Sequence, residues 1–449
     1  MVTSRAVTAQ HAVAFGVIVS LSVALLFLPI PTAVAQNTGK TVRHHKAEEQ
    51  GPAADELAQA ENDIDNSDYA KAEPLLKKYL EAQPENFVAW YDLGFVYRQL
   101  GRREDSIAAY RKSVSAKPDV FESNLNLGLA LADTGDPQAE QFLMTATKLS
   151  PRSNATQGHI RAWMALGALL ENTRPEEAIA AFEEAAKLDA RDPEPHLAMG
   201  TLFEKQRKFG DGEKEYQQVL NIAPDSADAL SALGNLYMRE KRFSDAEALL
   251  EKLVQLHPND AGVHFQLGRM LAIAGKNEDA TKELEVGLKH DPADQKAQRD
   301  LADLDAESGK YDDAARLYTT LLSSNPNEHG LHLGLGRVLL KQKKSAEAEK
   351  ELIKAAELKP DSGETYGELA VAANANKDYP LAIKAADIRA KYLPENPMSY
   401  FLRATAYDHL RDAKQAARYY HQFLDVAEGK YPEQEWQATH RLIAIEPKK

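Results

Sequence analysis

The sequence contains no cysteine among its 449 residues. The protein therefore forms no disulfide and has no thiol nucleophile, and a lipid-modified N-terminal cysteine is excluded. The sequence also lacks an HExxH motif, a P-loop and a G-x-S-x-G motif, which mark metal-dependent, nucleotide-dependent and serine-dependent catalysis. These absences favour a protein that is not an enzyme, and we expect neither a metal nor a cofactor.

An excess of positive charge is also missing. The chain has 54 lysines and arginines against 68 aspartates and glutamates, which gives a formal net charge of −14. A nucleic-acid-binding surface normally requires a basic excess. The composition therefore argues against nucleic acid as the main partner.

Long apolar runs are absent except at the N-terminus, where residues 12–28 read AVAFGVIVSLSVALLFL. Two prolines follow, and then the small residues Ala33-Val34-Ala35. This order predicts a secretory signal peptide in residues 1–35 that is cut after Ala35, and hence a bacterial periplasmic or secreted protein. The alternative is an uncleaved anchor in the inner membrane, formed by residues 12–30.

The next segment, residues 36–52, has no hydrophobic periodicity and is rich in polar residues. We therefore predict a disordered linker there. Its two adjacent histidines are expected to be solvated, because two neighbouring residues alone do not complete a metal site.

The rest of the chain is marked by a proline that returns every 34 residues. A period of this size indicates stacked supersecondary units rather than independent domains. The prolines in phase are Pro84, Pro118, Pro224, Pro258, Pro292, Pro326, Pro360 and Pro394.

Each period carries two apolar stripes at helical spacing, as residues 227–260 illustrate. Lys241-Arg242 separates the stripes, and Pro258 ends the second one. Each unit is therefore predicted to be an αα-hairpin whose apolar faces need neighbours on both sides. Gly234 in the first helix and Ala246 in the second are expected to let the two helices approach closely.

The pattern resembles the tetratricopeptide repeat: a bulky residue, Leu-Gly, Tyr, and later Ala, an aromatic residue and Pro. The segment 87–120 shows it most fully, with Trp90, Gly94, Tyr97 and Pro118. The resemblance implies an all-α fold, a right-handed αα-superhelix or solenoid. The same packing glycine recurs at Gly128, Gly167, Gly200, Gly234, Gly268 and Gly336.

Eleven such units fill residues 53–430. A further amphipathic segment in residues 431–449 is expected to form a helix that caps the last repeat, followed by a short tail. The units are 53–86, 87–120, 121–153, 160–192, 193–226, 227–260, 261–294, 295–328, 329–362, 363–396 and 397–430.

Some residues depart from the pattern. Asp305, Arg389 and Arg403 stand at positions that are usually apolar, so we expect packing to loosen toward the C-terminus. His264 and His332 occupy the bulky fourth position of their repeats. We expect these histidines to pack in the array rather than to bind a metal.

The resemblance implies a concave face lined by the first helix of each repeat, mainly by repeat positions 2, 5, 9 and 12. In units two to four these positions form an apolar stripe, which predicts a docking groove for an amphipathic segment unless neighbouring helices bury it. The residues of this stripe are Tyr91, Phe95, Leu125, Leu129 and Met164.

In units six to nine the same face carries several basic residues, which predicts an anion-binding track. The alternative is that acids such as Asp303 and Glu307 neutralise them within the array. The residues of this track are Asn235, Arg239, Arg269, Arg299, Arg337 and Lys341.

Two functions fit this surface. The first is an interaction scaffold that holds a segment of a partner protein or peptide. The second is an accessory subunit that guides or binds an exopolysaccharide. Sugar binding favours exposed aromatic residues along a whole groove, whereas the aromatic groove positions end at Phe95 and return only at Phe401. The sequence therefore favours a protein partner, and membrane contact is expected only through an uncleaved N-terminus.

Overall fold

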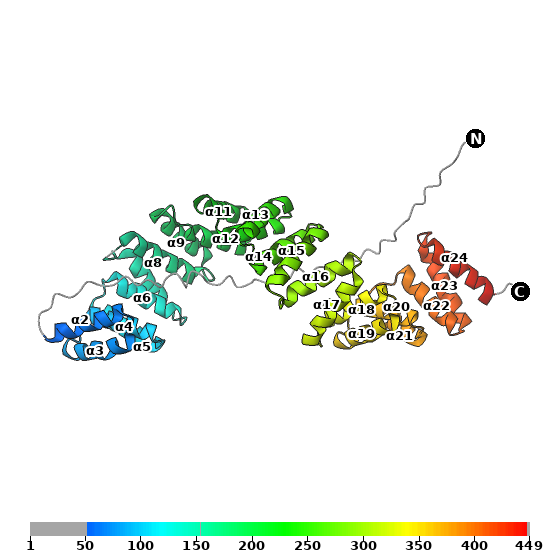
Figure 1. Ribbon diagram of the computed structural model, residues 1–449, viewed down its shortest axis with the longest axis horizontal. Coiled ribbons are helices and arrows are strands. Elements are labelled where there is room, and N and C mark those ends of the chain that lie inside the picture. Colours follow the sequence, from blue (N-terminus) through cyan, green and yellow to red (C-terminus); the bar gives the residue numbers. More distant parts are fainter. Residues whose placement is uncertain (1–51, 153, 447–449) are drawn as a thin grey trace, which may run out of the picture. The chain divides into compact units, whose positions relative to one another are not determined.

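The computed structural model describes residues 52–152 and 154–446, and within these ranges every regular element is an α-helix (Figure 1). The 23 helices confirm the all-α solenoid fold class. The predicted signal peptide, or anchor, and nearly all of the predicted linker lie outside the described residues.

The described residues divide into two compact units, with the boundary between Asp189 and Ala190. The helices of the first are α2 (Pro52–Asp65), α3 (Tyr69–Ala82), α4 (Phe87–Gln99), α5 (Arg103–Ala116), α6 (Phe121–Ala132), α7 (Ala139–Lys148), α8 (Ala155–Leu170) and α9 (Pro175–Leu188).

The second unit continues the same alternation. Its helices are α10 (Glu194–Lys205), α11 (Phe209–Ile222), α12 (Ala227–Arg239), α13 (Phe243–Leu256), α14 (Ala261–Ile273), α15 (Asn277–His290), α16 (Gln295–Glu307), α17 (Tyr311–Ser324), α18 (His329–Lys341), α19 (Ser345–Leu358), α20 (Gly363–Ala375), α21 (Tyr379–Tyr392), α22 (Pro397–His409), α23 (Ala413–Ala427) and α24 (Pro432–Ile445).

In seven repeats the first helix begins with a side-chain cap at a fixed place, two residues after the periodic proline. Asn86, Ser226 and Ser362 each accept a hydrogen bond from the backbone N–H three residues later. Such a cap satisfies one of the free N–H groups of the first turn. The sequence period therefore sets where the first helix starts in these seven repeats.

The turn between the two helices of a repeat has a left-handed residue at the fifteenth position in most repeats. Glycine fills this position at Gly101, Gly275 and Gly309, whereas Lys241 and Lys343 adopt the same conformation with φ of 61°. The N–H of Arg242 donates to the carbonyl of Tyr237 over 2.8 Å, which is the bond that closes a Schellman cap. The turn geometry is thus kept even where the residue is not glycine.

The paired helices touch at the predicted glycines. A Cβ added at Gly94 would lie 2.7 Å from the Tyr110 ring, and one at Gly234 would lie 2.9 Å from Leu250. The other five glycines behave alike, with distances of 2.4–3.0 Å to a side chain of the second helix: Gly128, Gly167, Gly200, Gly268 and Gly336. All seven glycines therefore lie where the two helices of a repeat approach each other closely.

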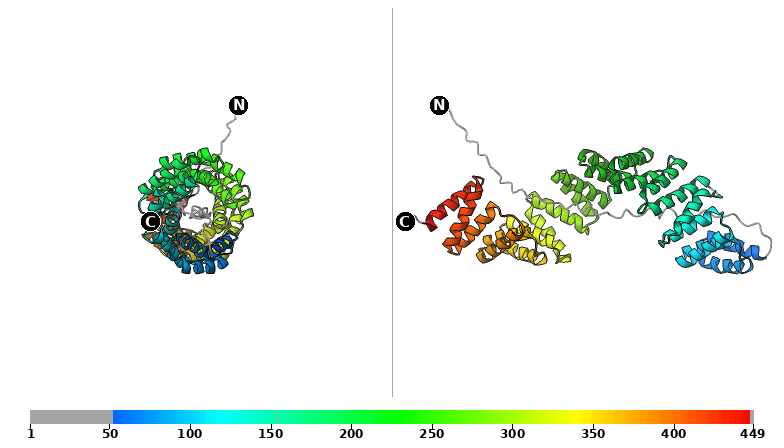
Figure 2. Two further views of the ribbon diagram at one scale, coloured as in Figure 1. Left: turned by 90° about the vertical axis from the view of Figure 1, so that its left-hand side faces the viewer. Right: turned by 180° about the vertical axis from the view of Figure 1, so that it is seen from behind.

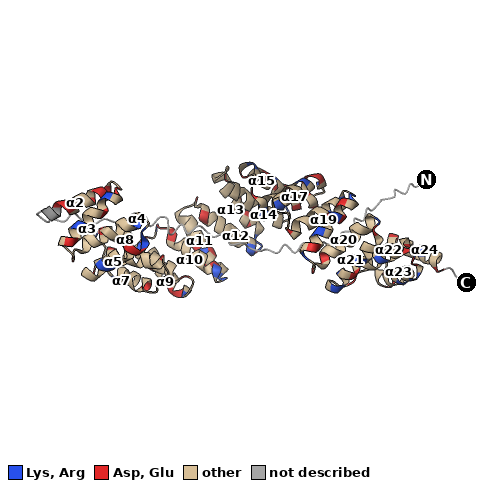
Figure 3. Ribbon diagram, turned by 90° about the horizontal axis from the view of Figure 1, so that it is seen from below, with Lys and Arg blue, Asp and Glu red and all other residues tan. Residues whose placement is uncertain are grey.

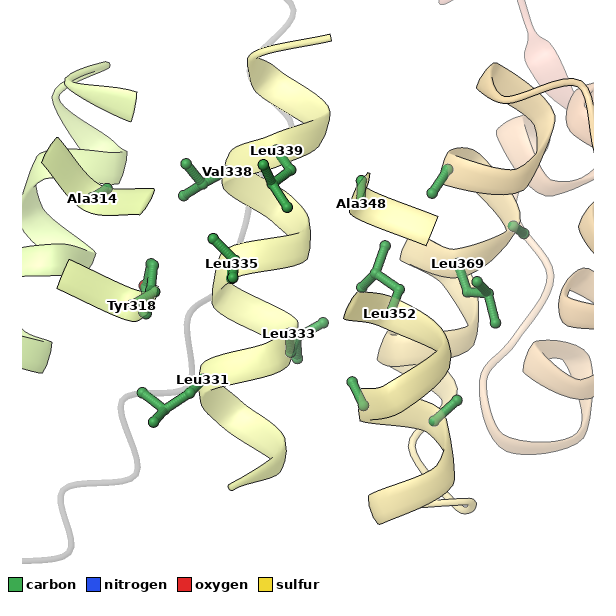
Figure 4. Packing of buried hydrophobic residues seen from close by; sticks show 14 of the residues in the cluster. Ala314, Tyr318, Leu331, Leu333, Leu335, Val338, Leu339, Ala348, Leu352 and Leu369 are labelled. Atoms are coloured by element: carbon green, nitrogen blue, oxygen red, sulfur yellow. The ribbon is translucent and has the colours of Figure 1, made fainter. Parts of the chain in front are cut away.

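The buried apolar residues form clusters that extend across successive helix pairs. Around α18, Leu331, Leu333 and Leu335 pack among the residues of α17, α19 and α20 (Figure 4). Tyr318 from the preceding repeat and Leu352 from the same repeat belong to this cluster. Each repeat therefore buries its neighbour's apolar surface, as a repeat array requires.

Within each unit, the first helices of successive repeats contact one another, as α6 and α8 do in the first unit and α18 and α20 in the second. The second helices of the described repeats make no contact of similar extent. This asymmetry curves each unit toward its first helices, which agrees with the predicted concave face. We call the side lined by the first helices the A face; Figure 2 shows the helix pairs from two further sides.

The predicted terminal helix is α24, which packs on α23. Ala438 is fully buried in the last core cluster, and Leu442 and Ile445 pack against it. Trp436 and Ile443 point elsewhere and remain 62% and 67% exposed.

Candidate interaction surface

The apolar stripe of units two to four is largely inside the array. Tyr91, Leu125 and Met164 are 1%, 3% and 5% exposed. These three side chains present almost no surface to a partner, so the prediction of an apolar docking groove is wrong for them. Phe95 and Leu129 are half-buried, and their part in partner binding stays a prediction.

The cover over Tyr91 comes from the next repeat. The amide of Asn126, at the sixth position of its repeat, donates to the Tyr91 hydroxyl over 3.2 Å and to the Glu122 carbonyl over 2.8 Å. Burial raises the pKa of the Tyr91 hydroxyl well above its ordinary value. The side chain at position 5 of one repeat is therefore covered by the side chain at position 6 of the next repeat. Position 6 is not among the positions 2, 5, 9 and 12 that the family resemblance assigns to the concave face.

The four predicted arginines of the second unit are paired with carboxylates. Arg269 Nε lies 2.6 Å from Asp300 Oδ2, and Arg337 Nε lies 3.0 Å from Glu368 Oε1. A second carboxylate, that of Glu364, also contacts Arg337. The alternative of neutralisation within the array therefore describes these arginines, although the acids are not the ones that the sequence suggested.

The pairs follow a rule. Position 9 of one repeat meets position 6 of the next repeat, 31 residues later, in Arg269–Asp300 and Arg337–Glu368. Asn235 follows the same rule, because its Oδ1 accepts from Gln266 Nε2 over 3.0 Å. We call these three contacts the rungs of the A face.

Each ionic rung remains within reach of solvent. The side chains of Arg269 and Asp300 are 27% and 30% exposed, and those of Arg337 and Glu368 are both 32% exposed. Basic and acidic residues are interspersed over the helices, as Figure 3 shows. The rungs thus form a mixed polar surface in place of a purely basic track.

Unit eight departs from the rule because position 6 of the next repeat is Gly334, which offers no side chain. Asp303 instead accepts a hydrogen bond from the Tyr318 hydroxyl. Arg299, at position 5, has its Nη1 3.5 Å from Glu328 Oε2. A Cβ added at Gly330 would come within 2.6 Å of the Arg299 Nη2 atom.

The two flanking cations differ from each other. Arg239 reaches back to the preceding repeat, where its Nη1 lies 2.6 Å from Glu204 Oε1. Lys341 is exposed at the end of α18. It is the one basic residue of the predicted track for which the described part of the chain shows no ion pair, and its role in binding stays a prediction.

Comparison with known proteins decides the family. Models of the tetratricopeptide repeat match residues 57–120, 96–151 and 299–364, and a second such model matches residues 169–236, 203–272 and 237–304. These matches together cover more than half of the chain. The chain is a tetratricopeptide-repeat protein.

Relatives of this tetratricopeptide-repeat protein match it only in part. Tetratricopeptide repeat protein 5 of Mus musculus is 27% identical over 175 residues, which are 35% of this chain and 39% of the mouse protein. A repeat protein from Cytophaga hutchinsonii is 17% identical and covers 55% of this chain and 99% of its own, with a TM-score of 0.47. YrrB, whose structure is described as having an unusual peptide-binding site, is 19% identical and covers 42% and 96%, with a TM-score of 0.39.

Proteins of this family are scaffolds suited to protein–protein interaction.

The residue at the fourth repeat position links the first helix to the loop that precedes it. His264 Nε2 lies 3.0 Å from the Pro258 carbonyl and its Nδ1 lies 2.7 Å from Glu283. Two repeats later, His332 makes the same two contacts, with the Pro326 carbonyl and with Glu351. The indole N–H of Trp90 donates to the Pro84 carbonyl in the same way, over 2.7 Å.

The histidines at position 4 therefore link the first helix to the preceding loop and to a glutamate of the second helix. They pack within the array, as expected. The described residues contain no group of three or more histidine, cysteine, aspartate or glutamate side chains placed to hold a metal ion. Among them there is also no helix that is long and apolar enough to span a membrane.

Sequence reasoning missed the acidic and amide partners at position 6, namely Asn126, Gln266, Asp300 and Glu368. The signal was present, because each lies 31 or 35 residues after its partner. It becomes visible only when the repeats are aligned and compared one with the next.

Proposed function

We propose that this tetratricopeptide-repeat protein is a non-enzymatic interaction scaffold that holds a segment of a partner protein against the A face of its second unit. The observation that supports this proposal is the set of rungs. They occur at one face, from α12 to α20, in phase with the repeat.

The rungs favour a polypeptide because each presents donors and acceptors together. Arg269 and Gln266 supply N–H donors, while Asp300 and Glu368 supply carboxylate acceptors. An extended polypeptide likewise offers both amide N–H groups and carbonyls. The side chains are already held by their own pairing, so little conformational entropy is lost when a partner binds.

The pairing also changes which partner is expected. Arginines that are neutralised by neighbouring acids do not select a purely acidic ligand. We therefore propose a polar partner segment that carries charges of both signs, in place of the anionic ligand that the sequence suggested.

The exopolysaccharide alternative has no observation in its favour. Tyr91 is buried, and Phe401 packs against Tyr420 and Phe423 with ring centroids 6.1 and 5.1 Å away. These rings are engaged within the array, so they do not form the open aromatic platform that sugar binding favours.

Site-specific photocrosslinking in the native host tests the proposal. A photoreactive residue replaces Ser231, which is partly exposed on α12 of the A face, and in a matched control it replaces Glu251, which is exposed on the second helix α13. We expect protease-sensitive adducts from Ser231 and not from Glu251. Equal adducts at both positions, or an adduct at Ser231 that resists protease and is degraded by glycosidases, would overturn the proposal.

We also propose that the protein is exported, with cleavage after Ala35. The support is the order of apolar run, prolines and small residues in residues 12–35. N-terminal sequencing of protein from the native host should give Gln36 as the first residue. Intact Met1 in the membrane fraction would instead indicate the anchored form.

A further inference from the structure

The side chain at the fourth position of a repeat ties the first helix to the preceding loop in five repeats. A side-chain nitrogen of this residue lies 2.7–3.0 Å from the backbone carbonyl of the proline six residues earlier. The five residues are Trp90, Asn124, His264, Gln298 and His332. A carbonyl oxygen only accepts, and an indole or amide N–H is a permanent donor. The Nε2 atom of each histidine therefore carries a hydrogen in this bond.

The other ring nitrogen of the two histidines faces a carboxyl group. His264 Nδ1 lies 2.7 Å from Glu283 Oε2, and His332 Nδ1 lies 2.7 Å from Glu351 Oε2. A neutral imidazole that donates through Nε2 has only a lone pair at Nδ1, and an ionised carboxylate also offers only lone pairs. Each short contact therefore requires one more hydrogen, carried by Nδ1 or by the carboxyl group. Each pair thus holds one proton more than a neutral imidazole and a carboxylate hold together.

The glutamate and the histidine occur together in the repeats. A third repeat has the same pair, in which His196 Nδ1 lies 2.6 Å from Glu215 Oε2. In all three repeats the histidine is at position 4 and the glutamate at position 23. The six other repeats of 34 residues have neither, and their residues at position 23 are Leu75, Ala109, Leu249, Leu317, Ala385 and Tyr419. The pairing is therefore a feature of particular repeats and not of the repeat pattern.

Few other ionisable groups face these pairs. The side chains of His264 and His332 are 7% and 11% exposed. In the described chain no acid or cation of the helices packed on them, α13, α16, α17 and α20, forms an ion pair with either histidine. The acids of the preceding loops, Asp260 and Glu328, accept hydrogen bonds from backbone N–H groups of the first turn. The exposed His290 ring of α15 stacks on His264, with centroids 6.1 Å apart.

We propose that these histidine–glutamate pairs are proton-binding sites that make the second unit respond to pH. With the proton bound, the histidine ties the first helix both to the preceding loop and to the second helix. When the proton leaves to the solvent, two lone pairs face each other at Nδ1 and the bond between the helices is lost. The folded array holds a proton that the separated side chains release, so the stability from each pair is present at low pH and is lost as the pH rises.

The response is expected in alternate repeats. The pairs join α10 to α11, α14 to α15 and α18 to α19. The repeat formed by α12 and α13 lies between two of them and has Leu230 and Leu249 at the same positions. This repeat has no titratable group there and serves as an internal reference. The inference concerns the protein alone, so it stands apart from the proposed binding of a partner to the A face.

Hydrogen exchange of the purified protein, followed by mass spectrometry, measures the response. Histidine changes its charge between about pH 5 and pH 8, so about pH 6 and about pH 8.5 bracket the transition. After correction for the intrinsic pH dependence of exchange, peptides of α14, α15, α18 and α19 should lose protection at the higher pH by at least about fivefold relative to peptides of α12 and α13. An equal change in both sets of peptides would overturn the proposal.

The double substitution Glu283→Gln with Glu351→Gln tests the role of the shared proton. A glutamine amide can present its N–H or its carbonyl to Nδ1, so the contact is satisfied with or without a proton on the ring. Peptides of α14, α15, α18 and α19 should therefore keep their protection at the higher pH, while α10 and α11, where Glu215 remains, should still respond. A double variant in which α14, α15, α18 and α19 lose protection as much as in the wild type would overturn the proposal.

Discussion

Replacing Gly167 by alanine should destabilise the array, although alanine is the better helix former. A Cβ at this position of α8 would lie 2.4, 2.7 and 2.8 Å from three atoms of the Phe182 ring. Phe182 is only 2% exposed, so the rigid ring cannot turn into solvent. The added methyl group must therefore push α8 and α9 apart or displace the ring.

The magnitude follows from two opposing effects. Alanine in place of glycine favours a helix by about 1 kcal/mol. Overpacking a well-packed core costs about 1–3 kcal/mol, and three contacts shorter than 3 Å place Gly167→Ala near the upper end. We expect a net loss of about 1–2 kcal/mol in the free energy of unfolding.

Gly210 provides the matched control, since it also lies in a helix but a Cβ there has no neighbour within 4 Å. Gly210→Ala should therefore leave stability unchanged or raise it by up to about 1 kcal/mol. The two substitutions are chemically identical, so any difference in sign comes from packing.

Hydrogen exchange followed by mass spectrometry is the appropriate assay, because a long repeat array need not unfold in one step. Peptides from α8 and α9 should exchange faster in Gly167→Ala, and Phe182→Leu in the same chain should partly restore protection. Unchanged or increased protection of α8 and α9 in Gly167→Ala would refute the close-approach argument.

Three further predictions concern single positions. Lys343 is left-handed with φ of 61°, so Lys343→Gly should raise the unfolding midpoint by the equivalent of about 1 kcal/mol; a lower midpoint in urea would contradict this. Asp305 is 4% exposed and burial raises the pKa of its carboxyl, so its stabilising contribution is present below pH 4 and is lost as the pH rises. The melting temperature of Asp305→Asn should therefore rise relative to that of the wild type between pH 3 and pH 7. A difference in melting temperature that does not change with pH would contradict this prediction. The Arg403 side chain is 2% exposed and binds the more exposed carboxylates of Asp387 and Glu395. Its replacement by methionine should cost about 1–3 kcal/mol through the lost hydrogen bonds, measured by urea unfolding, and an unchanged free energy of unfolding would show that these bonds contribute little.

The sequence period predicted most of the fold. Helix starts, helix pairs and the packing glycines all follow from residues that recur in phase, because stacked repeats must solve the same packing problem each time. The glycine contacts also reflect the residue that units three and four lack in the turn between their helices. Gly128 contacts Leu143 and Gly167 contacts Phe182, so the partner comes one residue sooner after the glycine than in the regular repeats.

The surface was harder to predict because it depends on contacts between repeats. Tyr91 occupies a position expected to face a partner, but Asn126 of the next repeat covers it. For Arg269 the sequence left open an anion-binding role or neutralisation by acids such as Asp303, but the acid that binds it is Asp300, 31 residues further along the chain. A list of positions within one repeat cannot show such pairs.

Packing toward the C-terminus was predicted to loosen, and Arg403 shows why this prediction is wrong at its site. The guanidinium donates to the Asp387 and Glu395 carboxylates and to the Ala386 carbonyl over 2.6–2.9 Å. All three acceptors lie within 17 residues of it in the chain. The charged residue therefore takes the place of an apolar one by being fully paired, and the repeat stays closed.

The central claim is that the rungs of the A face contact the partner, and a charge exchange tests it most directly. The double variant Arg269→Asp with Asp300→Arg keeps the ion pair but exchanges the positions of its two charges, so folding should be preserved. With the partner identified by the Ser231 crosslink, calorimetric titration should show binding at least about tenfold weaker for this exchanged rung than for the wild type. Binding of wild-type strength by the exchanged rung, together with weakened binding by the unfolding-prone single substitution Arg269→Asp, would show that the rung only supports the fold and would contradict the claim.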